Sequence, residues 1–160
     1  MGIVLLLVAG GWLFFNQSST HFREERAQEG LPLVTVRVEK ASGGAVIFHA
    51  ELAATPKQQE RGLMFRTKLA ENAGMLFPFK EPKMTAFWMK NTLIPLDMVF
   101  IAEDGKIVNI ARNTAPESLA PISSGKPVFA VLEIGGSVAD RLGVQEGDVV
   151  VVDNNYSHAK

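Results

Sequence analysis

The sequence FWMKNTLIPLD fills residues 87–97 and says more about the fold than any other stretch of this chain. It places one cation (Lys90), one amide (Asn91) and one carboxylate (Asp97) among large apolar side chains. Unpaired charge is costly in such surroundings, so these groups must pair with other polar groups or serve a ligand. Residues 96–102 continue as an apolar run with bulky groups on both faces of a strand, and Asp97 is therefore expected to be partly buried.

Short apolar runs bounded by turn residues extend on both sides of this stretch. Alternation predicts a hairpin of strands at 33–38 and 45–52, and Asp104-Gly105 between apolar runs predicts a second hairpin of 96–102 with 106–111. Further strands are expected at 74–79, 85–90, 128–134 and 149–152. Thr55, Pro56 and Gln58 predict a capped helix that begins at residue 56, and residues 138–142 suit a single helical turn. We therefore predict a mainly β fold, a compact antiparallel β sandwich or barrel with one or two short helices.

Composition narrows the class of protein. The chain has 160 residues, of which 47% are hydrophobic and 21% charged, enough for one globular domain at 33–153. A net charge of −1 and the lack of a basic stripe predict no nucleic-acid partner. The chain has no cysteine, and its three histidines (His21, His49 and His158) are scattered, so we predict no metal site. No phosphate-cradling or dinucleotide-binding glycine pattern occurs, and we expect no cofactor.

The N-terminus predicts the compartment. Residues 3–15 form an unbroken apolar run that would reach about 20 Å as a helix, short of the roughly 30 Å hydrocarbon core of a membrane. This length is typical of a secretory signal, with an uncleaved anchor or a buried N-terminal helix as alternatives. We expect a signal peptide or membrane anchor at 1–16, a polar tether at 17–32 and a tail at 154–160. The domain would then be exported, either periplasmic or held at the inner membrane, with membrane contact through residues 1–16 alone.

Six motifs follow one another along the chain: TPKQQERGLMFR at 55–66, GMLFPF at 74–79, FWMKNTLIPLD at 87–97, DGKIV at 104–108, VLEI at 131–134 and RLGVxxGD at 141–148. In this order they resemble the uncharacterised prokaryotic family called domain of unknown function 192. The resemblance covers residues 33–153 and implies a jelly-roll-like β structure, often preceded by an export signal or anchor. It brings no established catalytic residues. This chain has Ile122 before Ser123-Ser124, where the family often has an aromatic residue, and a ligand that contacts this position would differ in shape or affinity.

The polar groups of 87–97 have two interpretations. In the functional one, Asp97 is a ligand-binding carboxylate, and Lys90 or Asn91 contacts an anionic or hydroxyl-rich partner. In the structural one, Asp97 forms an ion pair with Lys90 across the connecting turn, or caps backbone N–H groups there.

Three further charged residues are candidates. Arg61 and Arg66 flank a tight turn and either form a fork for a carboxylate or phosphate or lie on a solvated helix face. Glu133 lies in an otherwise apolar strand, where it either contacts Arg141 or a backbone turn, or acts with Asp97 as an acid and base pair.

These residues predict a binding module more than an enzyme, although a catalytic role stays open. The expected partner is a small polar or saccharide-like molecule or an envelope protein. Its surface would join the turn from Lys90 to Asp97, residues 61–66 and the loop at 114–125, with Phe87 and Trp88 as stacking surface. The alternatives are a hydrolase or lyase that uses Asp97 or Glu133 as base, and a structural envelope protein without a ligand.

Overall fold

The computed structural model describes residues 27–153. The predicted signal or anchor at 1–16 and the tail at 154–160 lie outside the described residues, as do residues 17–26 of the predicted tether. The end of that tether lies against the domain, since Gln28 Nε2 donates to the carbonyl oxygens of Gln58 (3.0 Å) and Gly62 (2.8 Å). Within residues 27–153, no helix has the length and apolar character that a membrane crossing requires.

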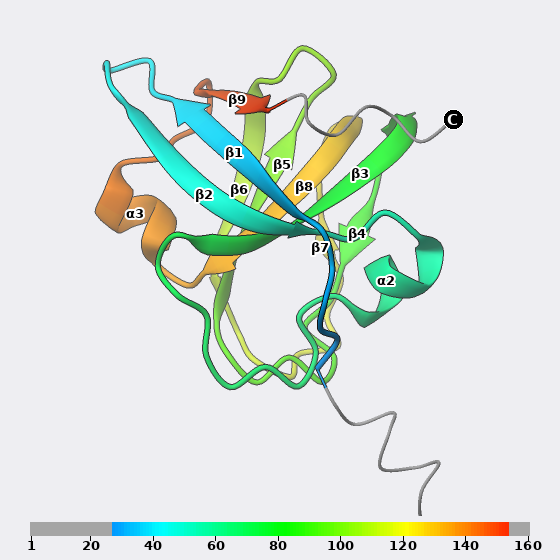
Figure 1. The fold of residues 1–160 in the computed structure, drawn as a ribbon. Helices are drawn as coiled ribbons and strands as arrows, with labels where there is room; N and C mark the ends of the chain where they lie inside the picture. Colours follow the sequence, from blue (N-terminus) through cyan, green and yellow to red (C-terminus); the bar gives the residue numbers. More distant parts are fainter. Residues whose placement is uncertain (1–26, 154–160) are drawn as a thin grey trace, which may run out of the picture.

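The described residues form nine strands and two short helices (Figure 1). In chain order they are β1 (Leu33–Glu39), β2 (Ala45–Leu52), α2 (Pro56–Arg61), β3 (Ala73–Lys83), β4 (Ala86–Phe87), β5 (Leu96–Ile101), β6 (Ile107–Thr114), β7 (Ile122–Ser123), β8 (Val128–Gly135), α3 (Val138–Leu142) and β9 (Val149–Val152). The predicted mainly β fold with one or two short helices is confirmed.

Seven strands form one curled sheet in the order β6-β5-β8-β3-β2-β1-β9, and β4 pairs with β7 beside it. All pairs are antiparallel except β2–β3, which is parallel because the crossover through α2 returns the chain to the same end of the sheet. The two edge strands meet at one end, where Lys106 bridges Val149 and the N–H of Val150 donates to the carbonyl oxygen of Gly105 (2.8 Å). The sheet therefore curls toward a barrel without closing along its length.

The central strands bury both faces of the sheet. Along β5, Val99 and Ile101 belong to one apolar cluster, and Met98 and Phe100 belong to a second cluster on the opposite face. All six residues of β5 are buried, as the double-sided apolar pattern of 96–102 predicts. Each cluster is covered differently. Residues of α3 pack on the first, and β4 and the segments around α2 cover the second (Figure 1).

Helix α2 begins at the predicted capping box. Thr55 Oγ1 accepts from the N–H of Gln58 (3.3 Å), and Gln58 Oε1 accepts from the N–H of Thr55 (2.9 Å). The helix is also tied to the sheet through Gln59, whose Nε2 donates to the carbonyl oxygens of Ala53 (3.0 Å) and Pro78 (2.8 Å). This places the C-terminal half of α2 beside β3.

At Gly74 the backbone of β3 lies close to that of β8. A Cβ atom at this position would lie 2.6 Å from the backbone oxygen of Glu133. Gly74→Ala is therefore expected to lower the free energy of unfolding by about 2 kcal/mol or more, since a backbone atom must move. Urea denaturation checks this against Gly135→Ala, whose Cβ would meet only a methyl of Val138 at 3.2 Å. Equal losses in the two variants would contradict the steric argument.

Candidate functional site

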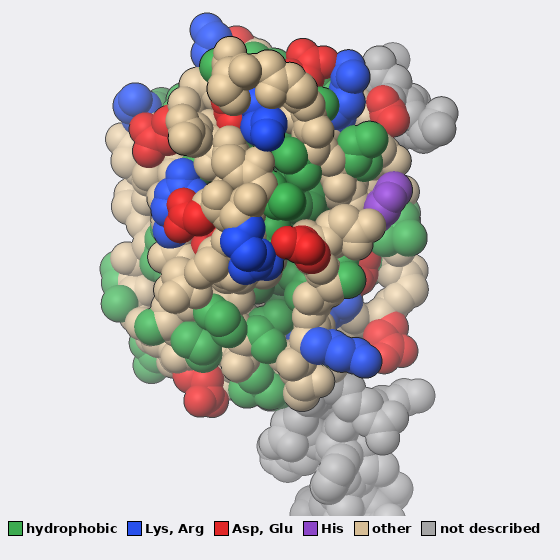
Figure 2. Space-filling model, turned by 90° about the vertical axis from the view of Figure 1, so that its left-hand side faces the viewer, with side chains coloured by type: hydrophobic (Ala, Val, Ile, Leu, Met, Phe, Trp, Pro, Cys, Tyr) green, Lys and Arg blue, Asp and Glu red, His purple; other side chains and the backbone are tan. Residues whose placement is uncertain are grey.

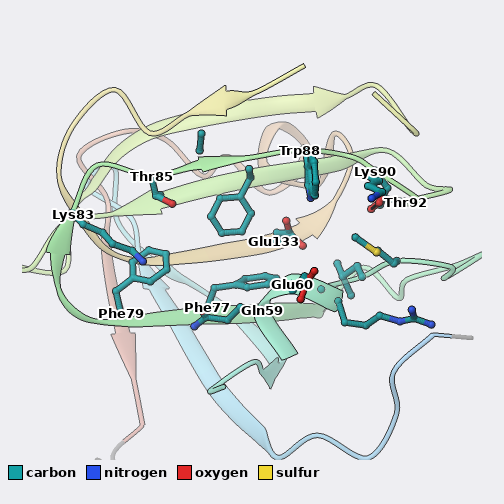
Figure 3. A pocket seen from close by; sticks show the side chains of 16 residues that line it. Gln59, Glu60, Phe77, Phe79, Lys83, Thr85, Trp88, Lys90, Thr92 and Glu133 are labelled. Atoms are coloured by element: carbon teal, nitrogen blue, oxygen red, sulfur yellow. Dashed lines mark hydrogen bonds between the residues drawn. The ribbon is translucent and has the colours of Figure 1, made fainter. Parts of the chain in front are cut away.

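A cavity of about 250 Å³ lies between α2, β3 and the segment from Thr85 to Thr92 (Figure 3). Its lining combines aromatic rings with three basic and two acidic side chains. Of the residues predicted from sequence, five line it: Arg61, Phe87, Trp88, Lys90 and Glu133. Segments far apart in the chain thus meet at one concave surface.

Glu133 projects from β8 into this cavity. It is only 4% exposed, and no residue of the described chain offers it a hydrogen bond or an ion pair. Burial favours the neutral form of the carboxyl group and raises the pKa of Glu133 from 4.5 to about 8. The predicted contact with Arg141 is not formed, because Arg141 Nε lies 3.2 Å from Glu71 Oε1 instead. An ionisable group is therefore buried at the cavity floor with nothing from the described protein to neutralise it.

Aromatic side chains form the walls. The ring of Phe77 on β3 meets that of Phe87 on β4 edge to face, with centroids 5.2 Å apart. Trp88 is 47% exposed and leaves much of its indole open to a ligand. Such surfaces bind apolar groups by area and cations through the ring face.

Basic side chains lie near the cavity mouth, each over an aromatic ring. Lys83 Nζ is 4.2 Å from the centroid of Phe79, and Lys90 Nζ is 5.1 Å from that of Trp88. The guanidinium of Arg61 lies 4.6 Å from the ring of Phe65. Figure 3 shows Lys83 at one end of the cavity, Lys90 at the other and Glu133 between them.

Asp97 lies away from this cavity. It is fully buried, and its Oδ1 accepts from the N–H groups of Asn113 (2.6 Å) and Ser137 (3.0 Å), while Oδ2 accepts from the N–H of Ala139 (2.8 Å). Ser137 makes no side-chain cap for α3, so Asp97 supplies it from a neighbouring strand. Asp97 therefore caps backbone N–H groups, but those of β6 and of the start of α3 and not those of the turn from Lys90 to Asp97, where the structural interpretation placed the cap. An ion pair with Lys90 is absent from the ion pairs of residues 27–153.

Asn91 and Arg66 also serve local structure. Asn91 takes a left-handed conformation (φ 55°), and its carbonyl oxygen accepts from the N–H of Phe65 (2.8 Å). Arg66 forms a two-pronged ion pair with Glu51, with both N–O distances 2.7 Å, and donates to the carbonyl oxygen of Gln28 (2.9 Å). Arg66 therefore makes a fork for a carboxylate, and that carboxylate is the protein's own Glu51.

The proposed acid and base pair of Asp97 and Glu133 is wrong for this fold. Strands β5 and β8 are neighbours, but Asp97 is paired with Ile134 and Met98 with Glu133. Paired residues share a face and successive residues alternate, so the two carboxyl groups point to opposite faces of the sheet. They cannot act on one substrate.

Several lining residues lay outside the sequence prediction, namely Gln59, Glu60, Phe77, Phe79, Lys83, Thr85 and Ala86. The alternation of Met75, Phe77 and Phe79 on β3 does signal one shared apolar face. It does not signal that β3 pairs with β8, and this pairing is what brings Glu133 to the same face. The loop at 114–125 supports the site from outside, since Ile122 pairs with Phe87, but it contributes no lining residue.

A second cavity of about 350 Å³ lies near the start of α3 and is lined in part by Pro95, Gly136 and Val138. Its two charged lining residues, Glu71 and Arg141, are paired with each other at 3.2 Å. Both charged side chains of this second cavity therefore have a partner, whereas Glu133 has none among the described residues. The cavity over Glu133 is the stronger candidate site. Across residues 27–153, no group of three or more histidine, aspartate or glutamate residues has the arrangement of a metal site.

A family model and two solved structures match this chain. The model of DUF192, described as an uncharacterized group, matches residues 37–152. The crystal structure of a protein called a "putative transcription regulator", from Sinorhizobium meliloti 1021, is 44% identical, with a TM-score of 0.76 over 78% of this chain and 97% of that one. A protein of unknown function from Novosphingobium aromaticivorans DSM 12444 is 42% identical, with a TM-score of 0.73 over 80% of this chain and 95% of that one.

A search of curated proteins found no match. The family match spans most of the globular domain, including α2, the 87–97 stretch and the strand that carries Glu133. The chain therefore belongs to the DUF192 family.

Proposed function

We propose that the domain is a non-catalytic binding module whose small polar ligand occupies the cavity over Glu133. The observation that carries the proposal is the buried carboxyl group of Glu133, without a partner among the described residues, in a cavity with aromatic walls. Burying such a group destabilises the protein, and groups of this kind concentrate at functional sites. A saturated or amide side chain would fill the same place at lower cost, so the carboxyl group points to a ligand.

The location of the protein is part of the same proposal. The apolar run at 3–15 supports export or membrane tethering, and the ligand would then be met outside the cytoplasm. An envelope protein that inserts a side chain into the cavity is a related partner, because the exposed Trp88 lies at the mouth.

Two other functions have less support. A role in transcription is suggested by the name of the Sinorhizobium protein alone. The net charge here is −1, and the face shown in Figure 2 carries acidic and basic side chains interspersed, without the single-sign field that nucleic acid favours. A hydrolase or lyase with Glu133 as base has its raised pKa in favour, but Asp97 lies on the opposite face.

Thermal shift measurements test the binding proposal. A ligand that binds the native state at 100 times its Kd stabilises it by about 2.7 kcal/mol. In a screen of sugars, amino acids and nucleotides, we expect at least one class to raise the melting temperature of the wild type. Glu133→Gln should abolish this rise, because the carboxylate contact is lost while side-chain volume is kept.

Glu71→Gln is the matched control, since Glu71 is an acidic residue of the second cavity. It should leave the ligand-induced shift unchanged. No shift in the wild type with any class would overturn the proposal, and a shift lost in Glu71→Gln but kept in Glu133→Gln would move the site to the second cavity. Consumption of the ligand, abolished in Glu133→Gln, would establish the enzyme instead.

A further inference from the structure

We infer that the ligand of this cavity is a small zwitterion, with a primary ammonium group held at Glu133 and an anionic group held by a lysine at the cavity mouth. The inference rests on the proposed function and names the ligand class for the same site. It follows from which hydrogen-bonding groups of the lining are already used and which are left.

The interior of the cavity offers acceptors. Glu133 contributes its carboxyl group without a partner among residues 27–153. Gln59 has both amide hydrogens committed, to the carbonyl oxygens of Ala53 and Pro78, so its side chain can offer only an oxygen. Glu60 of α2 adds a second carboxylate at the exposed edge of the cavity. A primary ammonium group has three N–H donors and no acceptor, and this matches what the interior lacks.

The walls favour the same charge. The rings of Phe77, Phe87 and Trp88 all line the cavity. Figure 3 shows Trp88 above Glu133 and Phe77 below it. An aromatic face attracts a cation within about 6 Å of its centroid, and more strongly where water is excluded. The lining already shows this preference at its edges, where Lys83 and Lys90 lie over Phe79 and Trp88.

The two ends of the cavity favour the opposite charge. Neither Lys83 nor Lys90 belongs to an ion pair within the described part of the chain. They lie on either side of Glu133 (Figure 3), so an anionic group reaches a lysine whichever way the ligand extends from the floor. A ligand that carries only a cation would leave both lysines without an anionic partner, and the two lysines would repel it as it enters.

The size of the cavity limits the ligand. A volume of about 250 Å³ is below the roughly 300–1,000 Å³ of sites that hold drug-sized molecules. An aminoalkyl carboxylate or aminoalkyl phosphate of a few carbons fits this limit, and 4-aminobutyrate is a simple probe of the class.

Proton release distinguishes this ligand from a neutral one. An ammonium group pairs with ionised Glu133, whereas the free carboxyl group is mostly protonated at pH 6.5 because its pKa is about 8. The other charged groups that line the cavity are Glu60 and Arg61 from α2, Lys83 from β3, and Lys90. Binding should therefore release close to one proton per ligand, while a sugar that accepts a hydrogen bond from the neutral carboxyl group should release none.

The test is isothermal titration calorimetry at pH 6.5 in two buffers of different ionisation enthalpy. The probes are 4-aminobutyrate, butylamine, butyrate and glucose. We expect 4-aminobutyrate to bind at least tenfold more tightly than butylamine or butyrate, and the buffer dependence of its binding enthalpy to give close to one released proton.

Two variants separate the ends of the ligand. Glu133→Gln should lower the affinity for 4-aminobutyrate and for butylamine at least tenfold and abolish proton release. The affinity for butyrate should stay unchanged. The double variant Lys83→Gln/Lys90→Gln should lower the affinity for 4-aminobutyrate and butyrate but leave the affinity for butylamine unchanged. Both lysines are replaced in the same protein because either one can hold the anionic group.

The outcomes also separate this inference from the proposed function. Binding of glucose or another neutral probe, sensitive to Glu133→Gln and without proton release, would overturn the zwitterion and keep the binding module. Equal affinities for 4-aminobutyrate and butylamine would remove the role of the lysines and overturn it too. If none of the four probes binds, the zwitterion class is wrong, and the wider ligand screen decides the proposed function separately.

Discussion

Replacing Asp97 with alanine is expected to lower the free energy of unfolding by about 4 kcal/mol, a loss in the range reached by only the most damaging single substitutions. The carboxylate is fully buried and accepts from three backbone N–H groups, those of Asn113, Ser137 and Ala139. Alanine would leave all three donors buried without a partner, and α3 would lose its cap. Whole domains are stable by only about 5–15 kcal/mol, so the variant would lose a large part of its free energy of unfolding.

Urea denaturation measures this loss, with Asp140→Ala as the matched control. Asp140 is an acidic residue of the same helix, but its side chain is 64% exposed and forms its ion pair with Arg112, at 2.8 Å. Exposed ion pairs contribute about 1 kcal/mol or less, so the control should change stability little. Asp97→Asn should lie between the two, because its amide nitrogen turns a donor toward a backbone donor. An Asp97→Ala loss no larger than that of Asp140→Ala would show that the cap is dispensable.

Much of the fold is encoded locally and was predictable. The capping box at Thr55 and Gln58, the Asp104-Gly105 hairpin and the double-sided apolar pattern of β5 all depend on neighbours in sequence. The parallel pairing of β2 with β3 was not predictable, because it depends on where the crossover returns the chain. No pattern within either strand records it.

The site, too, was predictable only in part. Sequence identified Glu133, Lys90, Trp88 and Arg61 as unusual or exposed groups, and all four line the cavity. It also grouped Asp97 with Lys90, because they are seven residues apart in one motif. The structure separates them: Asp97 faces the cluster beneath α3, and Lys90 lies over Trp88 on the other side of the sheet.

Successive residues of a strand point to opposite faces, so Asp97 and Met98 face opposite sides of the sheet. Met98 is paired with Glu133 and shares its face, which is the face of the cavity. Sequence can say that a charged residue is buried. It cannot say which face of which neighbouring strand it meets until the register is known.

The free domain is expected to become less stable as pH rises from 5 to 8, with Glu133 as the cause. Folding raises the pKa of this group from 4.5 to about 8. Below pH 4.5 the carboxyl group is protonated in both states, and its burial then costs least. Between 4.5 and 8 the unfolded chain gives up the proton and the folded chain keeps it, so each unit of pH favours the unfolded state by up to about 1.4 kcal/mol. Above pH 8 both states are ionised and the loss is complete.

The difference between Glu133→Gln and the wild type isolates this contribution, because the other titrating groups are common to both proteins. Glutamine mimics the neutral acid, so the variant should match the wild type near pH 4 and exceed it by several kcal/mol near pH 8.5. Chemical denaturation at five or six pH values measures the difference. Glu60→Gln, which changes an exposed acid of the same cavity, should give a small difference throughout. A Glu133→Gln difference that does not grow with pH would show that the carboxyl group is neutralised within the folded protein.

The same profile links stability to binding. If Glu133 destabilises the free domain above pH 5 because it lacks a counter-charge, a ligand that supplies the charge should flatten the pH dependence of the wild type. It should leave that of Glu133→Gln as it was. A neutral ligand would raise stability most where the acid is protonated and would steepen the dependence. The slope of stability against pH, measured with and without ligand, therefore reports the charge of the group that enters the cavity.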